Sequence, residues 1–77
     1  MTDYLGNGIG AFYVHRQVEA GSGETYSYYE YIHRTGKVVL MREHATTGDI
    51  DYADGGFDAD TAWTGRESLE YKKINEL

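Results

Sequence analysis

The chain is short and acidic, with 77 residues, 13 acidic side chains against 7 basic ones and a net charge of −6. A chain of this length has room for one domain, and we expect a single small β-rich domain over residues 11–77. The negative charge disfavours direct binding to nucleic-acid phosphates or to an anionic membrane surface. The absence of cysteine excludes disulfides, thiolate metal ligands and cysteine nucleophiles.

The first ten residues predict a flexible arm. Gly6, Gly8 and Gly10 lie in a segment with little periodicity, and glycine at this density favours no single backbone conformation. The segment has neither a basic stretch nor a continuous apolar run, so we expect no secretion signal and no membrane span. The protein is expected to be cytoplasmic where it is synthesised, with incorporation into a virion as a further destination.

Apolar and polar residues alternate over residues 11–19, which is the two-residue period of a strand. Phe12, Val14 and Val18 are predicted to share one side of this strand, and Arg16 interrupts that side. Glycines at positions 21 and 23 then predict a turn or a short loop.

The strongest pattern in the sequence is a hairpin. Residues 25–34 are rich in Tyr and Ile, residues 37–43 are rich in Val, Leu and Met, and only Thr35 and Gly36 lie between them. Two strand-like runs separated by a short turn segment that contains glycine are typical of a β-hairpin.

A two-residue loop would pair Ile32 with Val39 and Tyr31 with Leu40. Both faces of the hairpin are then apolar near its middle, whereas a sheet with one solvated face should alternate cleanly. We therefore expect both faces to be covered, by a helix, a second sheet or another subunit.

Residues 49–60 contain five aspartates, two adjacent glycines and no basic residue. This composition predicts a loop with a short edge strand at 50–52. Two interpretations fit the rest of the chain. Asp58 or Asp60 caps a short helix that is followed by a last strand, or residues 64–67 form a capping box that opens a helix running to the C-terminus. The apolar residues from Leu69 onward fall on no compact helical stripe, so we favour the first interpretation.

These elements predict a mainly β protein with a minor α component. Its sheet should be small and antiparallel, with three to five strands around the hairpin at Thr35 and Gly36, and with at most one short helix near residues 58–66.

The aspartate-rich segment is the best candidate for an ion site, because calcium takes about six to eight oxygen ligands. Asp49, Asp51 and Asp60 match positions one, three and twelve of an EF-hand loop, but the glycine required between them is replaced by Asp54. We favour a solvated turn and keep calcium as the weaker alternative. The weak candidate ligands are Asp49, Asp51, Asp54, Asp58 and Asp60.

Tyrosines are concentrated on the first strand of the hairpin. They fill a thin core in the favoured interpretation, and they form a contact surface in the alternative, because tyrosine offers a large rigid area with a polar tip. The candidate partner contacts are Tyr26, Tyr28, Tyr29, Tyr31, Met41 and Trp63.

We find no nucleophile elbow, no phosphate loop and no paired acid and base, so we expect a non-enzymatic protein without a cofactor. The first hypothesis is a structural, assembly or protein-binding domain, such as a small accessory component of a phage particle or another oligomer, whose partner is itself or a larger assembly. The alternative is an acidic inhibitor or nucleic-acid mimic that binds a basic protein surface. The second alternative is a calcium-binding module through residues 49–60.

Overall fold

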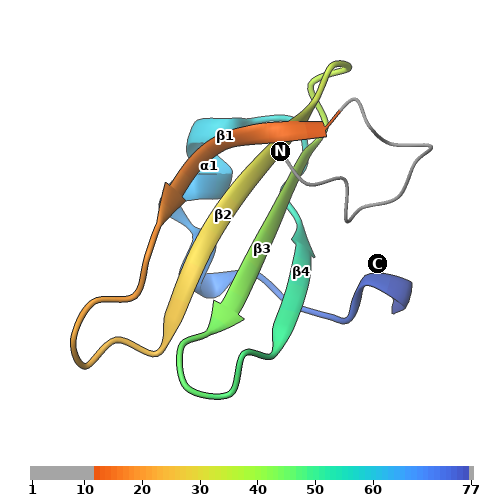
Figure 1. The fold of residues 1–77 in the computed structure, drawn as a ribbon. Coiled ribbons are helices and arrows are strands. Elements are labelled where there is room, and N and C mark those ends of the chain that lie inside the picture. The colour runs from red at the N-terminus through yellow and green to blue at the C-terminus, as the bar shows by residue number, and fades with distance from the viewer. Residues whose placement is uncertain (1–11, 77) are drawn as a thin grey trace.

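The computed structural model describes residues 12–76, and the predicted N-terminal arm lies outside them. The fold is an antiparallel sheet of four strands, whose order in the sheet is their order in the sequence (Figure 1). The prediction of a mainly β fold is confirmed. Its strands are β1 Phe12–Val18, β2 Tyr26–His33, β3 Val38–His44 and β4 Ile50–Asp54. Three short helical elements follow, namely α1 Ala59–Thr64 and the 3-10 turns η2 Arg66–Ser68 and η3 Ile74–Glu76. None of the helices in this part of the chain is long and apolar enough to cross a membrane.

The predicted hairpin is formed by β2 and β3, but its loop has three residues instead of two. The N–H of His33 donates to the carbonyl of Lys37, and the N–H of Gly36 donates to the carbonyl of His33, both at 2.8 Å. Gly36 has a φ of 96°, in the left-handed region that favours glycine. It therefore closes a turn of the three-residue type.

The predicted register is wrong by one residue for this reason. Ile32 pairs with Val38 and Tyr31 pairs with Val39. Relative to β2, each side chain of β3 therefore lies on the face opposite to the one that the two-residue loop predicts, because neighbouring residues of a strand point to opposite faces.

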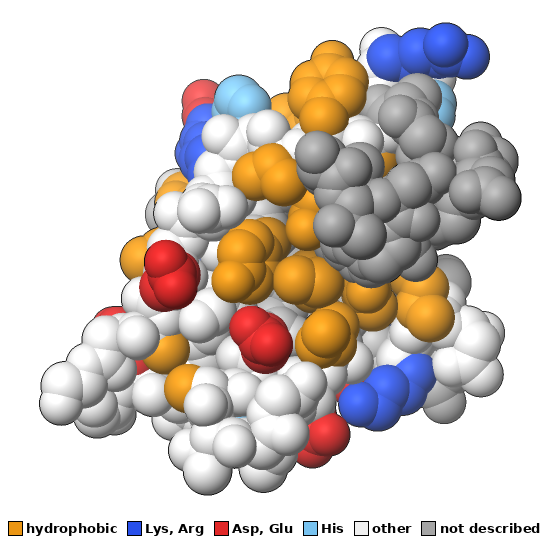
Figure 2. Space-filling model, in the orientation of Figure 1, with side chains coloured by type: hydrophobic (Ala, Val, Ile, Leu, Met, Phe, Trp, Pro, Cys, Tyr) orange, Lys and Arg blue, Asp and Glu red, His pale blue; other side chains and the backbone are white. Residues whose placement is uncertain are grey.

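Both faces of the sheet carry buried apolar residues, as the sequence predicts. The cluster on the α1 side consists of Val38, Leu40, Ala53 and Ala62, with Trp63, Leu69 and Tyr71 packed against it. The cluster on the opposite side consists of Phe12, Tyr31, Val39, Met41 and Tyr52. Figure 2 shows hydrophobic side chains gathered over the middle of this second face, with acidic side chains at its margin.

A bulge between Val14 and Arg16 changes the pattern of β1. The bulge inserts one extra residue, so the side chains beyond it exchange faces. Arg16 pairs with Glu30 on the α1 side, and Val18 falls on that side too. The prediction that Phe12, Val14 and Val18 share one side is therefore wrong at Val18.

The short edge strand predicted at 50–52 is present and two residues longer, since β4 pairs with β3 from Ile50 to Asp54. Gly55 follows it against the core, where an added Cβ would lie 2.7 Å from Cγ1 of Val38. The close approach explains why a glycine ends this strand, because any side chain there would displace a buried neighbour.

The segment after β4 contains the predicted short helix, but the predicted last strand is not formed. Asp58 caps α1 by accepting a hydrogen bond from the N–H of Thr61 at 3.1 Å, and Gly65 ends the helix. The place of the last strand is taken by one bridge, in which Lys72 and Tyr52 exchange backbone hydrogen bonds of 2.6 and 2.7 Å. This bridge occupies the middle of the outer edge of β4.

Candidate binding sites

The five aspartates that the sequence marks as weak metal candidates are dispersed. Four of them contact cations or a backbone N–H: Asp51 lies near Arg42 and Lys73, Asp54 near Lys37, Asp58 on the N–H of Thr61, and Asp60 near Arg16. Across residues 12–76, no group of three His, Cys, Asp or Glu side chains is arranged to hold a metal ion. Residues 12–76 therefore contain no set of side chains that would support the calcium hypothesis.

The tyrosines of β2 are divided between the two faces of the sheet. Tyr29 and Tyr31 lie with Met41 on the face opposite α1, whereas Tyr26 and Tyr28 lie on the α1 side. Tyr28, Tyr31 and Met41 are each at most 9% exposed. These three side chains belong to the core, and Tyr26 and Tyr29 keep part of their surface accessible.

Arg42 of β3 lies between two aromatic rings on the α1 side. Its guanidinium carbon is 4.3 Å from the ring centroid of Tyr26 and 4.3 Å from that of Tyr71. Its Nε is 3.7 Å from a carboxylate oxygen of Asp51. Stacking against aromatic faces stabilises a cation, so the guanidinium is held on the side of β4. Burial raises the pKa of Tyr71, whose hydroxyl donates to the carbonyl of Arg66 at 2.8 Å.

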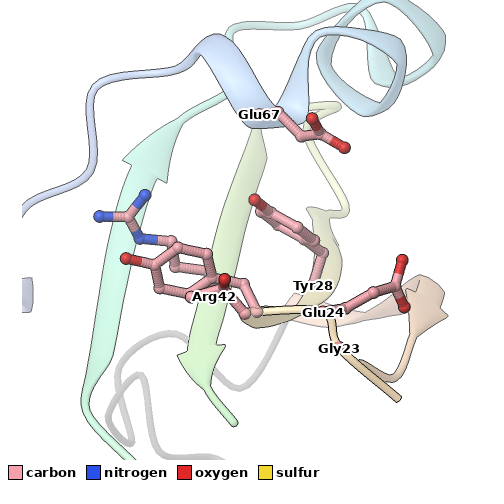
Figure 3. Close-up of a pocket in the computed structure, with 7 residues that line it drawn as sticks. Gly23, Glu24, Tyr28, Arg42 and Glu67 are labelled. Atoms are coloured by element: carbon pink, nitrogen blue, oxygen red, sulfur yellow. The ribbon is translucent and has the colours of Figure 1, made fainter. Parts of the chain in front are cut away.

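A pocket of about 400 Å³ opens beside this stack. Tyr26 and Tyr28 form its aromatic wall, with ring centroids 6.1 Å apart and ring planes inclined by 55°. Glu24 from the β1–β2 loop and Glu67 from η2 line it as well, on either side of the Tyr28 ring (Figure 3). Burial raises the pKa of Tyr28, and the negative charge of Glu67 raises it further.

Glu30 of β2 is a charged side chain without exposed surface. Its Oε1 lies 3.4 Å from Nε of Arg16, and neither carboxylate oxygen accepts a hydrogen bond within the described residues. Arg16 also donates a hydrogen bond to Asp60 of α1. Burial raises the pKa of Glu30, and the charge of Arg16 opposes this effect. The bulge in β1 thus directs Arg16 to a position between β2 and α1.

The edge strand β1 exposes apolar side chains on both faces of the sheet. Tyr13 is 54% exposed, Val14 38% and Val18 39%. Among the described strands, only β2 pairs with β1, so its outer side has no partner strand there. The sequence-based prediction missed these residues. The signal that identifies them is the adjacent apolar pair Tyr13 and Val14, whose side chains must point to opposite faces of a strand.

No protein-family model matches the chain, and comparisons with curated proteins and with solved structures give no significant match. The functional interpretation therefore depends on the geometry of the described residues.

Proposed function

We propose that the protein is a non-enzymatic assembly domain that binds a second copy of itself through β1. The observation that supports this proposal is the exposure of Tyr13, Val14 and Val18 along the outer strand of the sheet. An unpaired edge strand presents backbone N–H and C=O groups that can hydrogen-bond to another strand. Pairing two β1 strands would satisfy these groups and remove apolar side chains from water.

The charge distribution favours a second copy as the partner. The whole chain has a net charge of −6, which would drive two copies apart at most surfaces. β1 has no acidic residue, and its one charged residue, Arg16, is engaged by Glu30 and Asp60. Two copies can therefore approach through β1 with less repulsion than through strands that carry exposed carboxylates.

The proposal is tested by the solution mass of the protein, measured by light scattering during gel filtration at micromolar concentration. We expect about twice the chain mass of 8.7 kDa. The dimer should persist in about 1 M salt, where the screening length falls to about 3 Å, because apolar contacts and backbone hydrogen bonds hold it. A mass of one chain throughout this range contradicts the proposal.

A matched pair of variants locates the interface. Tyr13→Lys places a charge on β1, and symmetric pairing brings two such charges close together, so we expect this variant to be monomeric. Ile74→Lys makes the same kind of change at a residue of similar exposure, 47%, outside the sheet, and this variant should remain a dimer. Equal dissociation of both variants would place the interface elsewhere.

A further inference from the structure

The pocket beside Tyr28 combines aromatic walls with carboxylates and lies away from β1. Its volume of about 400 Å³ falls within the range of roughly 300 to 1,000 Å³ that is usual for ligand pockets. The rings of Tyr26 and Tyr28 are inclined to each other and form one wall. In Figure 3 the carboxylates of Glu67 and Glu24 stand on either side of the Tyr28 ring.

The two carboxylates have acceptor capacity left for a ligand. Glu67 makes no ion pair or hydrogen bond with another described residue at the distances that define such contacts. Glu24 uses Oε1 to accept a hydrogen bond of 2.6 Å from the N–H of Gly21, which leaves Oε2 for another donor. Both side chains are exposed, so a ligand can reach them.

The positive charge of Arg42 is directed out of the pocket. Its guanidinium lies between Tyr26 and Tyr71 and beside Asp51, and in Figure 3 it points away from Glu24 and Glu67. Arg42 is also one of the residues that line the pocket. Arg66 is a second cation near this wall, with its guanidinium carbon 5.6 Å from the ring centroid of Tyr28. Among the charges that act on the Tyr28 hydroxyl, that of Glu67 has the largest influence on its pKa, ahead of Arg42 and Arg66.

We propose that this pocket binds the cationic end of a lysine or arginine side chain presented by a protein partner. The carboxylates of Glu24 and Glu67 accept hydrogen bonds from the cation, and such charge-assisted bonds are stronger than neutral ones. The rings of Tyr26 and Tyr28 already lie next to the guanidinium groups of Arg42 and Arg66. Their part is to contact the alkyl portion of the bound side chain. The proposal does not depend on pairing through β1.

The probe is N-acetyl-lysine methylamide, titrated into the full chain while backbone amide chemical shifts are recorded by NMR, with the arginine analogue in a parallel titration. We expect saturable shifts confined to residues around Gly23, Tyr28 and Glu67, with a dissociation constant on the order of 1 mM for a single side chain. The norleucine analogue, which has a similar shape without the charge, should cause no such shifts.

Two variants separate this site from the general attraction of an acidic protein. Glu67→Gln removes one pocket charge from an exposed position and should weaken binding of the lysine probe at least about 5-fold. Glu43→Gln removes the same charge on the opposite face of the sheet and should leave binding unchanged. Shifts that do not saturate, that spread over the molecule, or that weaken equally in both variants overturn the proposal. Saturable binding of free cadaverine together with no response to the capped amino acids would also overturn the assignment to a protein side chain.

Discussion

The buried carboxylate of Glu30, next to the partly exposed Arg16, is the group whose charge most directly bears on stability. Glu30 lies on the α1 side of the sheet without a hydrogen bond from the described chain, and Arg16 approaches it only to 3.4 Å. Removing a charge from water costs free energy that an imperfect ion pair does not recover. Glu30 should therefore reduce the stability of the fold at neutral pH.

We predict that Glu30→Gln stabilises the protein at pH 7 by about 1 kcal/mol, because it removes a buried charge while Arg16 keeps its contact with Asp60. Burial raises the pKa of Glu30 in the folded protein above its unfolded value. The protonated form therefore favours folding at low pH, and this contribution is lost as the pH rises through the folded pKa. The advantage of the amide should shrink as the pH falls toward about 4. Urea unfolding of the wild type and the variant at pH 7 and at about pH 4 measures this difference in stability. A variant less stable than the wild type at pH 7 would show that the ion pair stabilises the fold.

The chemistry of single residues is only partly predictable from the sequence. Asp58 was recognisable as one of two candidate helix caps, with Asp60 as the other, because an aspartate directly before a short helical segment satisfies its free N–H groups. The burial of Glu30 was not recognisable, since glutamate is almost never fully buried unless it is paired. Arg16 reaches Glu30 only because of the bulge in β1. The alternating sequence gives no sign of this bulge.

At the scale of the elements, the short helix α1 is capped by the side chain of Asp58. The helix has only six residues, and isolated helices of this length are unstable in water. The carboxylate of Asp58 accepts the N–H of Thr61, and this hydrogen bond lowers the pKa of Asp58. Stability from the charged cap is therefore present above the ordinary aspartate pKa and is lost as the pH falls through the lowered value.

We predict that Asp58→Ala lowers the urea midpoint at pH 7, because the N-terminal N–H groups of α1 lose their acceptor. Asp58→Asn keeps an acceptor oxygen at the same position and should lie closer to the wild type. The difference between the aspartate and asparagine proteins should decrease at about pH 3, where the carboxylate gains a proton. Fluorescence of Trp63 in α1 follows the transition. Equal midpoints for the alanine and wild-type proteins would mean that packing alone holds this helix.

The four strands and α1 were predictable, whereas the 3-10 turns and the register of the hairpin were not. Strand β3 begins with Val38, Val39, Leu40 and Met41, a continuous apolar run. Such a run presents apolar residues to both faces of the sheet in either of two registers that differ by one residue. The hydrophobic pattern alone therefore does not determine how β3 pairs with β2. The backbone of the turn decides the register, because Gly36 takes a positive φ as the third loop residue.

At the scale of the whole molecule, the two hydrophobic clusters share one sheet. Leu40 and Met41 are neighbours on β3 and belong to different clusters. Disrupting β3 should therefore disrupt both faces together. The prediction that both faces are apolar is confirmed. One face is covered by α1 and its C-terminal extension, and a helix was one of the three covers expected from the sequence.

We predict that Leu40→Ala destabilises the protein by about 2 to 5 kcal/mol, because the side chain has no exposed surface and its loss leaves a cavity. Trp63 is the single tryptophan and reports on the α1 face, whereas circular dichroism reports on the whole sheet. Both signals should change in one coincident transition. Ile74→Ala, at a half-exposed position outside the sheet, should shift stability by less than about 0.5 kcal/mol. Separate transitions would show that the two clusters unfold independently.

The bridge between Lys72 and Tyr52 determines what kind of assembly this sheet permits. It occupies the outer edge of β4 and leaves β1 as the edge without a partner strand among residues 12–76. If two molecules join through their β1 strands, each uses its open edge, and the combined sheet ends on both sides at a β4 strand whose middle is paired with Lys72. Growth then stops at two copies, because an interface that uses the same patch on both molecules is self-terminating. Concentrating the protein should increase the fraction of pairs without producing filaments.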